Sequence, residues 1–183
     1  LRYIVLAWAS VALGYSTAQG SALVGVVAIG TAVGAVVASM RMHLDKATRV
    51  MPLGVMMGLL VVAMIWIDHF WIAVPFLIVV GAIGGFLVVP MNALLQHRGH
   101  LLMGAGRSIA VQNFNEQAAI LLLGIAYSAA TGFGVSTFAA VAGFGAFVAL
   151  VMALIQRWHR YNQVHHGDEL AKLLKLTRDQ PHV

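Results

Sequence analysis

Long apolar runs separated by short polar connections make up most of the chain. Five runs, at about residues 18–40, 50–67, 71–95, 108–131 and 135–156, are each long enough to predict a helix that crosses the hydrocarbon core of a bilayer, which takes roughly 20 residues. A sixth run, at about residues 1–15, is shorter and predicts part of such a helix. We therefore expect an all-α integral membrane protein with one truncated and five complete spans, starting inside a longer protein.

The apolar runs do not alternate as the strands of a membrane barrel do. Runs such as LLVVAMIWI and FLIVVGAIGGFLVV are apolar on every face, whereas barrel strands place lipid-facing and lumen-facing residues in turn. A helix satisfies its own backbone hydrogen bonds where lipid offers no partner. The pattern therefore favours a helix bundle and excludes a closed barrel.

The composition supports the same class. Apolar residues make up 61% of the 183 residues, charged residues only 9%, and the mean hydropathy is +0.89. A soluble domain carries about 25% charged residues, because it needs a wettable surface. The composition excludes one ordinary soluble domain, a nucleic-acid-binding domain and a disordered chain, and the formal net charge of +5 is better explained by membrane topology.

Basic residues are confined to every second connection and to the tail. The connections GYSTAQG, IDHFW and ATGFGVS hold no Lys or Arg, whereas the others and the tail hold ten of the eleven: Arg41, Lys46, Arg49, Arg98, Arg107, Arg157, Arg160, Lys172, Lys175 and Arg178. Loops rich in Lys and Arg remain cytoplasmic. This distribution predicts a cytoplasmic C-terminus, a bundle over residues 1–160, and a polar cytoplasmic tail over residues 161–183, in which DELAKLLKL is either amphipathic on the inner leaflet or simply solvated.

Small residues recur at helical spacing inside two of the spans. Gly30, Gly34 and Ala38 lie four residues apart, which stacks them on one helix face. Gly81, Gly84 and Gly85 precede Pro90 in another span, where they favour close packing and a bend. Both patterns are more typical of helix packing than of a functional site.

Two sets of polar residues at membrane depth are the candidates for function. Charged groups there are costly and face other helices or a wet cavity. Arg2 belongs to the truncated helix, either as a functional group or as an anchor at the interface. In the run 108–131, a broad helix face carries Gln112, Asn113, Glu116 and Gln117, with Asn115 between them. This face predicts a substrate or ion site, a gating network, or a static network between helices.

Catalytic and metal-binding patterns are lacking. The chain has no cysteine, and its eight histidines form no His-Glu-x-x-His motif. No phosphate-binding glycine loop, no nucleophile with a plausible base and no His-x4-Asp acyltransferase spacing is present. We expect neither an enzyme nor a bound cofactor or metal.

The chain resembles the second half of the bacterial lysophospholipid transporters of the major facilitator superfamily. The similarity is carried by LRYIVLAWASVALGY, VVAIGTAVGAVVAS, VGAIGGFLVVPMNALLQHRG and MGAGRSIAVQNFNEQAA, and it spans about residues 1–160. Within these stretches PMNALLQ and GAGxxIAVQN are the most specific blocks.

The resemblance implies the C-terminal six-helix half of a twelve-helix transporter, with most of helix seven and all of helices eight to twelve. It implies a place in the bacterial inner membrane and the movement of lysophospholipids, such as lysophosphatidylethanolamine, from the outer to the inner leaflet. It further implies a partner, a cytoplasmic acyltransferase that restores the missing acyl chain. It also implies that Arg2 handles the polar head group and that Gln112, Asn113 and Glu116 begin helix eleven at the substrate path.

Two other functions are compatible with the sequence. A facilitator for a small polar solute would use the same fold. A membrane scaffold without transport activity, or the membrane half of a lipid-modifying fusion protein, would also contain apolar helices, and a His-x4-Asp domain elsewhere in the full gene would favour the fusion.

Overall fold

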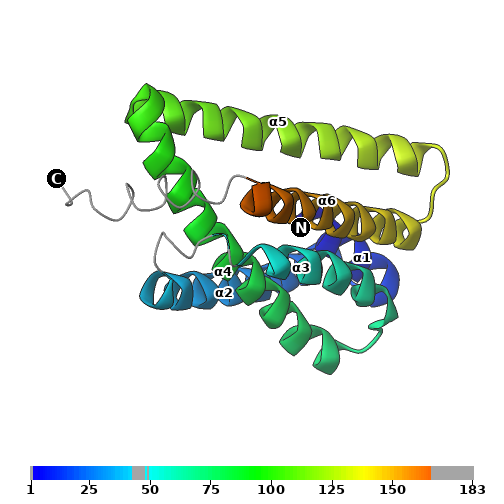
Figure 1. Cartoon of the computed structure of the whole chain (residues 1–183). Helices are drawn as coiled ribbons and strands as arrows, with labels where there is room; N and C mark the ends of the chain where they lie inside the picture. The colour runs from blue at the N-terminus through cyan, green and yellow to red at the C-terminus, as the bar shows by residue number, and fades with distance from the viewer. Residues whose placement is uncertain (1, 43–47, 49, 166–183) are drawn as a thin grey trace.

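The computed structural model describes residues 2–42, 48 and 50–165, and this part of the chain is helical without strands, as expected. Within residues 2–42 and 50–165, short turns connect the helices (Figure 1). The elements are α1 (Arg2–Ala12), α2 (Thr17–Arg41), α3 (Met51–Ala63) with the 3-10 turn η2 (Met64–Trp66), α4 (Phe70–Met103), α5 (Ala105–Gly132) and α6 (Thr137–His165).

Three helices are long and apolar enough to cross a membrane. These segments are Thr17–Arg41, Phe70–His97 and Thr137–Asn162. Of the two other complete spans expected, α3 with η2 forms a shorter apolar helix, Met51–Trp66. Helix α5 has sufficient length but is less apolar, because its first half carries the polar residues noted above. Three of the five expected spans are therefore confirmed by length and composition.

Local sequence signals set the helix boundaries. Ser16 caps α2: its hydroxyl accepts a hydrogen bond from the Gln19 backbone N–H, while the Gln19 side chain accepts one from the Ser16 backbone N–H at 3.0 Å. Pro52 lies in the first turn of α3, where its missing N–H costs nothing. Gly104, with φ of +83°, forms the whole connection between α4 and α5.

Glycines bring α2 and α4 into backbone contact. A Cβ atom at Gly30 would overlap the carbonyl oxygen of Ile78, and one at Gly34 would overlap that of Ala82. From the other side, a Cβ at Gly85 would overlap the carbonyl oxygen of Thr31. The predicted packing role of these glycines is confirmed, and it explains why α2 and α4 form the most extensive helix pair described.

A second pair, α3 with α6, also depends on small residues. A Cβ at Gly58 would lie 2.8 Å from the Ala149 Cβ, and one at Gly145 would lie 2.8 Å from the Gly58 carbonyl oxygen. Gly54 lies against the Met152 side chain. This pair was not predicted, although Gly54 and Gly58 have the same four-residue spacing as Gly30 and Gly34.

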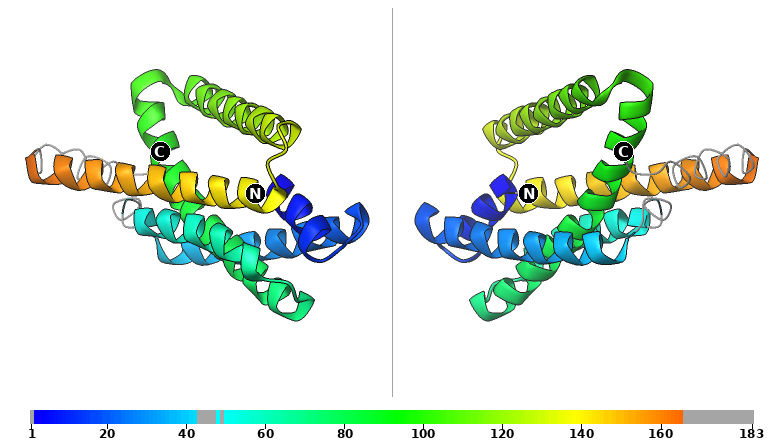
Figure 2. Two further views of the ribbon diagram at one scale, coloured as in Figure 1. Left: turned by 90° about the vertical axis from the view of Figure 1, so that its right-hand side faces the viewer. Right: turned by 90° about the vertical axis from the view of Figure 1, so that its left-hand side faces the viewer.

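The apolar core forms where all the helices except α5 meet. Its fully buried members include Val5, Trp8, Leu23, Leu77 and Val141, which come from α1, α2, α4 and α6. Helix α5 stands apart from this core and joins the other helices mainly through the far end of α4 (Figures 1 and 2). The polar candidates on α5 therefore lie outside the apolar core.

The ends of two helices differ from those expected. The connection predicted around Arg98 is helical, because α4 continues to Met103 and only Gly104 separates it from α5. Helix α6 continues beyond residue 156 to His165 and crosses the predicted boundary at residue 160. The division into residues 1–160 and 161–183 stays a prediction, and the DELAKLLKL segment lies outside the described residues.

Candidate substrate site

The polar face predicted on α5 is present and largely uncovered. Gln112 is half-buried, while Asn113, Glu116 and Gln117 are exposed. Charged and amide groups on a membrane helix need polar surroundings. The described helices place few polar groups around this face. It is therefore open to a ligand or to a further protein segment.

One hydrogen bond links this face to the neighbouring helix. The Gln96 side-chain amide on α4 donates to the Gln112 side-chain oxygen at 3.4 Å. Its length and exposure make it a weak bond. Gln96 was not among the predicted site residues, although it ends the PMNALLQ block used for the resemblance. Only the fold of α4 and α5 as a hairpin brings the two glutamines together.

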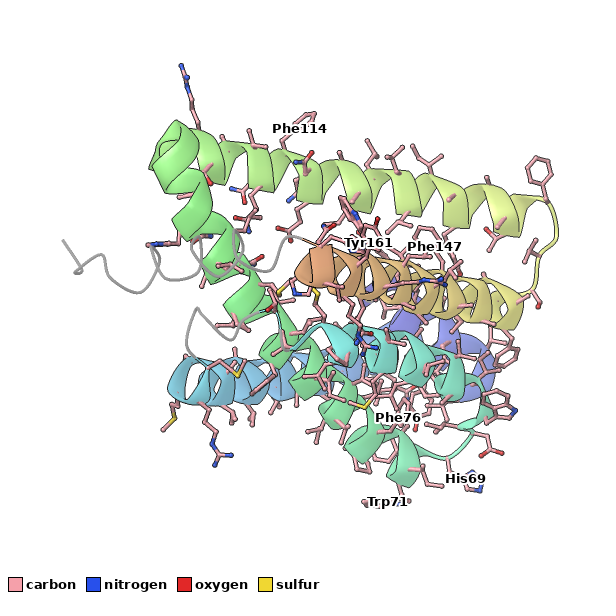
Figure 3. All side chains as sticks on the ribbon, viewed as in Figure 1. His69, Trp71, Phe76, Phe114, Phe147 and Tyr161 are labelled. Carbon is pink, nitrogen blue, oxygen red and sulfur yellow. The ribbon has the colours of Figure 1, made fainter. Side chains whose placement is uncertain are left out.

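The position of Phe114 defines the direction of the polar face. Its ring is 72% exposed and points away from α6 (Figure 3). Gln112 and Glu116 each lie two residues from Phe114, which is 200° around the helix. They therefore lie on the side of α5 that is turned toward the other helices. Asn113 lies next to them, and Gln117 lies further round, about 60° from Phe114.

Arg2, the other predicted site residue, is not brought to this face. It begins α1, one turn before the buried Val5, and α1 packs against α2 and α6. Helix α1 lies near the end of the molecule where α5 ends, whereas Gln112 and Glu116 are in the first half of α5 (Figures 1 and 2). The four predicted residues thus lie in two separate places in the described structure, Arg2 on α1 and the other three on α5.

Ion pairs are rare among the described side chains. Within residues 2–42, 48 and 50–165, the salt bridge found is between His69 and Asp68, at 3.6 Å and highly exposed, and such a pair contributes little. Among the residues whose side chains the structure describes, Glu116 has no ionic partner. The same residues contain no group of three His, Asp or Glu placed to hold a metal ion.

Three buried nitrogen atoms lack a hydrogen-bond partner in the described part of the protein. They are Trp8 Nε1, His97 Nε2 and His159 Nε2. Buried polar groups are normally paired. His97 follows Gln96 directly, so the end of α4 that contacts α5 has further hydrogen-bonding capacity.

The chain is similar to curated bacterial transporters. It is 43% identical over 162 residues to the lysophospholipid transporter LplT of Salmonella arizonae, covering 87% of this chain and 40% of the relative. It is 40% identical over 161 residues to LplT of Klebsiella pneumoniae and of Escherichia coli K12, again covering 87% of this chain and 41% of each relative. No family model and no solved structure matches the chain.

These relatives, together with the three apolar spans, define a multi-pass membrane protein. The resemblance to lysophospholipid transporters is confirmed, and the relatives are named as transporters rather than as enzymes. The chain spans about two fifths of the length of the curated relatives it matches.

Proposed function

We propose that this chain is part of a lysophospholipid transporter of the bacterial inner membrane. The observation that carries this proposal is the identity of 40–43% over 87% of the chain to proteins named as lysophospholipid transporters. In this proposal the chain supplies the C-terminal half of a twelve-helix major facilitator, with its C-terminus cytoplasmic, and a six-helix N-terminal half completes the cavity. Lysophosphatidylethanolamine moves from the outer to the inner leaflet, where an acyltransferase re-acylates it.

The arrangement on α5 supports a substrate that is polar at one end and apolar at the other. Gln112 and Glu116 provide a polar patch on the first half of the helix. The second half exposes large apolar side chains, among them Leu121, Leu122 and Ile125. A lysophospholipid needs such a polar region for its head group next to an apolar region for its single tail.

Arg2 and the α5 residues lie apart in the described structure, so in this proposal they have separate roles toward the head group. The guanidinium of Arg2 is the proposed partner for the phosphate, because its planar fork can donate two parallel hydrogen bonds. Glu116, Gln112 and Asn113 either accept hydrogen bonds from the ethanolamine ammonium or latch the cytoplasmic side of the cavity. The hydrogen bond between Gln96 and Gln112 supports the latch, because it already connects α4 with α5.

Transport by the complete protein tests the proposal. We expect the full-length protein, reconstituted in vesicles with fluorescent lysophosphatidylethanolamine, to move this lipid between leaflets faster than protein-free vesicles do. The 183-residue chain alone is the matched control, and we expect it to insert without transporting. Uptake of a small polar solute with no lipid movement would favour the solute facilitator, and a lack of any transport by the full-length protein would favour a scaffold or fusion protein.

A further inference from the structure

The last turns of α6 carry aromatic, aliphatic and basic side chains on one face. At 100° per residue this face spans about 160°. Its members include three highly exposed residues, Trp158 (68%), Tyr161 (58%) and Val164 (82%), and two exposed arginines, Arg157 and Arg160. The opposite side holds the half-buried Gln156, His159 and Asn162. The large and the basic residues are therefore on the more exposed side of the helix, and these three polar residues on the less exposed side.

A local contact orders part of this face. The rings of Tyr161 and His165 are stacked, with centroids 4.0 Å apart and 25° between their planes. The His165 Nδ1 atom also lies 3.0 Å from the Tyr161 carbonyl oxygen. These contacts hold the Tyr161 ring along the helix surface (Figure 3).

The length of α6 places this face at a membrane boundary. From Thr137, the first residue of the span Thr137–Asn162, to Trp158 the helix rises about 32 Å. This matches a hydrocarbon core of about 30 Å. When Thr137 is at one boundary, Trp158 is at the other, and Arg160 and Tyr161 enter the head-group layer. This end of α6 projects beyond the other described helices, so they do not cover it (Figure 2).

We propose that this face, defined by Arg157, Trp158, Arg160, Tyr161 and Val164, binds anionic phospholipid head groups. Trp and Tyr rings are favourable at the level of the head groups. Each arginine near an anionic membrane surface contributes about 1 kcal/mol, a factor of about five in local lipid concentration, and its guanidinium can bind a lipid phosphate through two hydrogen bonds. The site requires only that the chain spans a membrane, and it is independent of the transported substrate.

The enrichment of anionic lipid at this face is measurable with a single label. Because the chain has no cysteine, Val164→Cys gives one position for a fluorophore. The labelled chain is placed in phosphatidylcholine nanodiscs that contain traces of phosphatidylglycerol or phosphatidylcholine spin-labelled near the head group. We expect phosphatidylglycerol to quench the fluorophore at a concentration up to about 30-fold lower than phosphatidylcholine requires, since two arginines act together. This preference for the anionic lipid should weaken as salt is added.

Arginine variants separate lipid binding from a general membrane effect. The double variant Arg157→Gln with Arg160→Gln should reduce the ratio between the quenching concentrations of the two lipids to near one. Changing both arginines to lysine should retain most of the preference, because the charge remains. Arg41→Gln, at the exposed end of α2, is the matched control and should leave the preference at Val164→Cys unchanged. Equal quenching by the two lipids in the parent chain, or a preference that survives the double Arg→Gln variant, would overturn the proposal.

Discussion

Gly34 of α2 faces the carbonyl oxygen of Ala82 of α4 so closely that no side chain fits between the two helices. The contact is backbone against backbone, and Gly30, Gly81 and Gly85 repeat it along the same pair. Lipid offers no hydrophobic force that would drive two apolar helices together, so close packing of this kind supplies much of the association. The pair α2 and α4 therefore depends on glycine at these positions.

Replacing Gly34 with alanine should destabilise the helix pair. The added methyl group would overlap Ala82 backbone atoms that cannot move independently of α4, and overpacking of this kind costs about 1–3 kcal/mol. We expect a lower midpoint of thermal unfolding in detergent. Gly25→Ala is the matched control, because a Cβ there meets no other atom within 4 Å and alanine favours the helix by about 1 kcal/mol. Equal midpoints for the two variants would contradict this account of the interface.

Topology can be measured with single cysteines at positions selected from the structure. We expect Asp68→Cys and Gly132→Cys to react with an impermeant reagent from outside intact cells, and Gly106→Cys to react only after the membrane is opened. Gly106 is exposed with open space around it, whereas a side chain at Gly99 would overlap the Ser108 hydroxyl. Reaction of Gly106→Cys from outside would reverse the predicted orientation. Asp45, also predicted to be cytoplasmic, lies outside the described residues.

The regular parts of the fold were predictable because their signals are local. The four-residue glycine spacing identified the surface through which α2 contacts another helix. The length of the apolar runs identified the spans of α2, α4 and α6. The pairing of α3 with α6 was not predicted, because about 90 residues separate Gly54 from Gly145 and Ala149 and nothing local links the two helices. The expected loop after residue 95 is helical, since residues 96–103 contain no proline and their one glycine, Gly99, packs against Ser108.

The candidate site was predictable in part for the same reason. The shared face of Gln112 and Glu116 follows from helix periodicity alone. The contact with Gln96 depends on a sharp reversal at Gly104, where a positive φ is required. The separation of Arg2 from Glu116 depends on how α1 packs against α2 and α6, which is tertiary information.

Gln96 and Gln112 should act as a pair in the full-length protein. Removing either side-chain amide breaks the same hydrogen bond, worth about 0.5–1.5 kcal/mol. We expect Gln96→Leu and Gln112→Leu each to change the transport rate, and the double variant to resemble the single variants. A double-mutant cycle on lipid movement measures this coupling. Strictly additive effects would show that the hydrogen bond has no role in transport.

Arg2→Ala should abolish lysophospholipid transport by the full-length protein without reducing its amount in the membrane. Arg2→Lys should restore little, because an ammonium lacks the planar fork that matches a phosphate. Transport assays with quantified reconstitution measure both variants. Parent-like rates in Arg2→Ala would show that this arginine only anchors α1 at the interface.

Glu116→Gln distinguishes the two roles proposed for this carboxylate. If Glu116 latches the cavity, transport of lysophosphatidylethanolamine and of lysophosphatidylglycerol should slow equally. If it contacts the ammonium, only the ethanolamine lipid should be affected, because the glycerol head group has no positive charge. Asn115→Ala, an adjacent exposed change outside the predicted set, serves as the control. Parent-like transport of both lipids would remove Glu116 from the site.

The two glycine-lined helix pairs also determine the order in which the protein can assemble during synthesis. Neither pair joins helices that are neighbours in the sequence: α2 is made before α3 but packs most extensively on α4, and α3 packs most extensively on α6. Since chains emerge from the ribosome at about 5–20 residues per second, α3 waits several seconds after its own synthesis for its main partner. During this time α4 is the main described helix that α3 can pack against, and the pair of α3 with α6 forms only after α6 has been made.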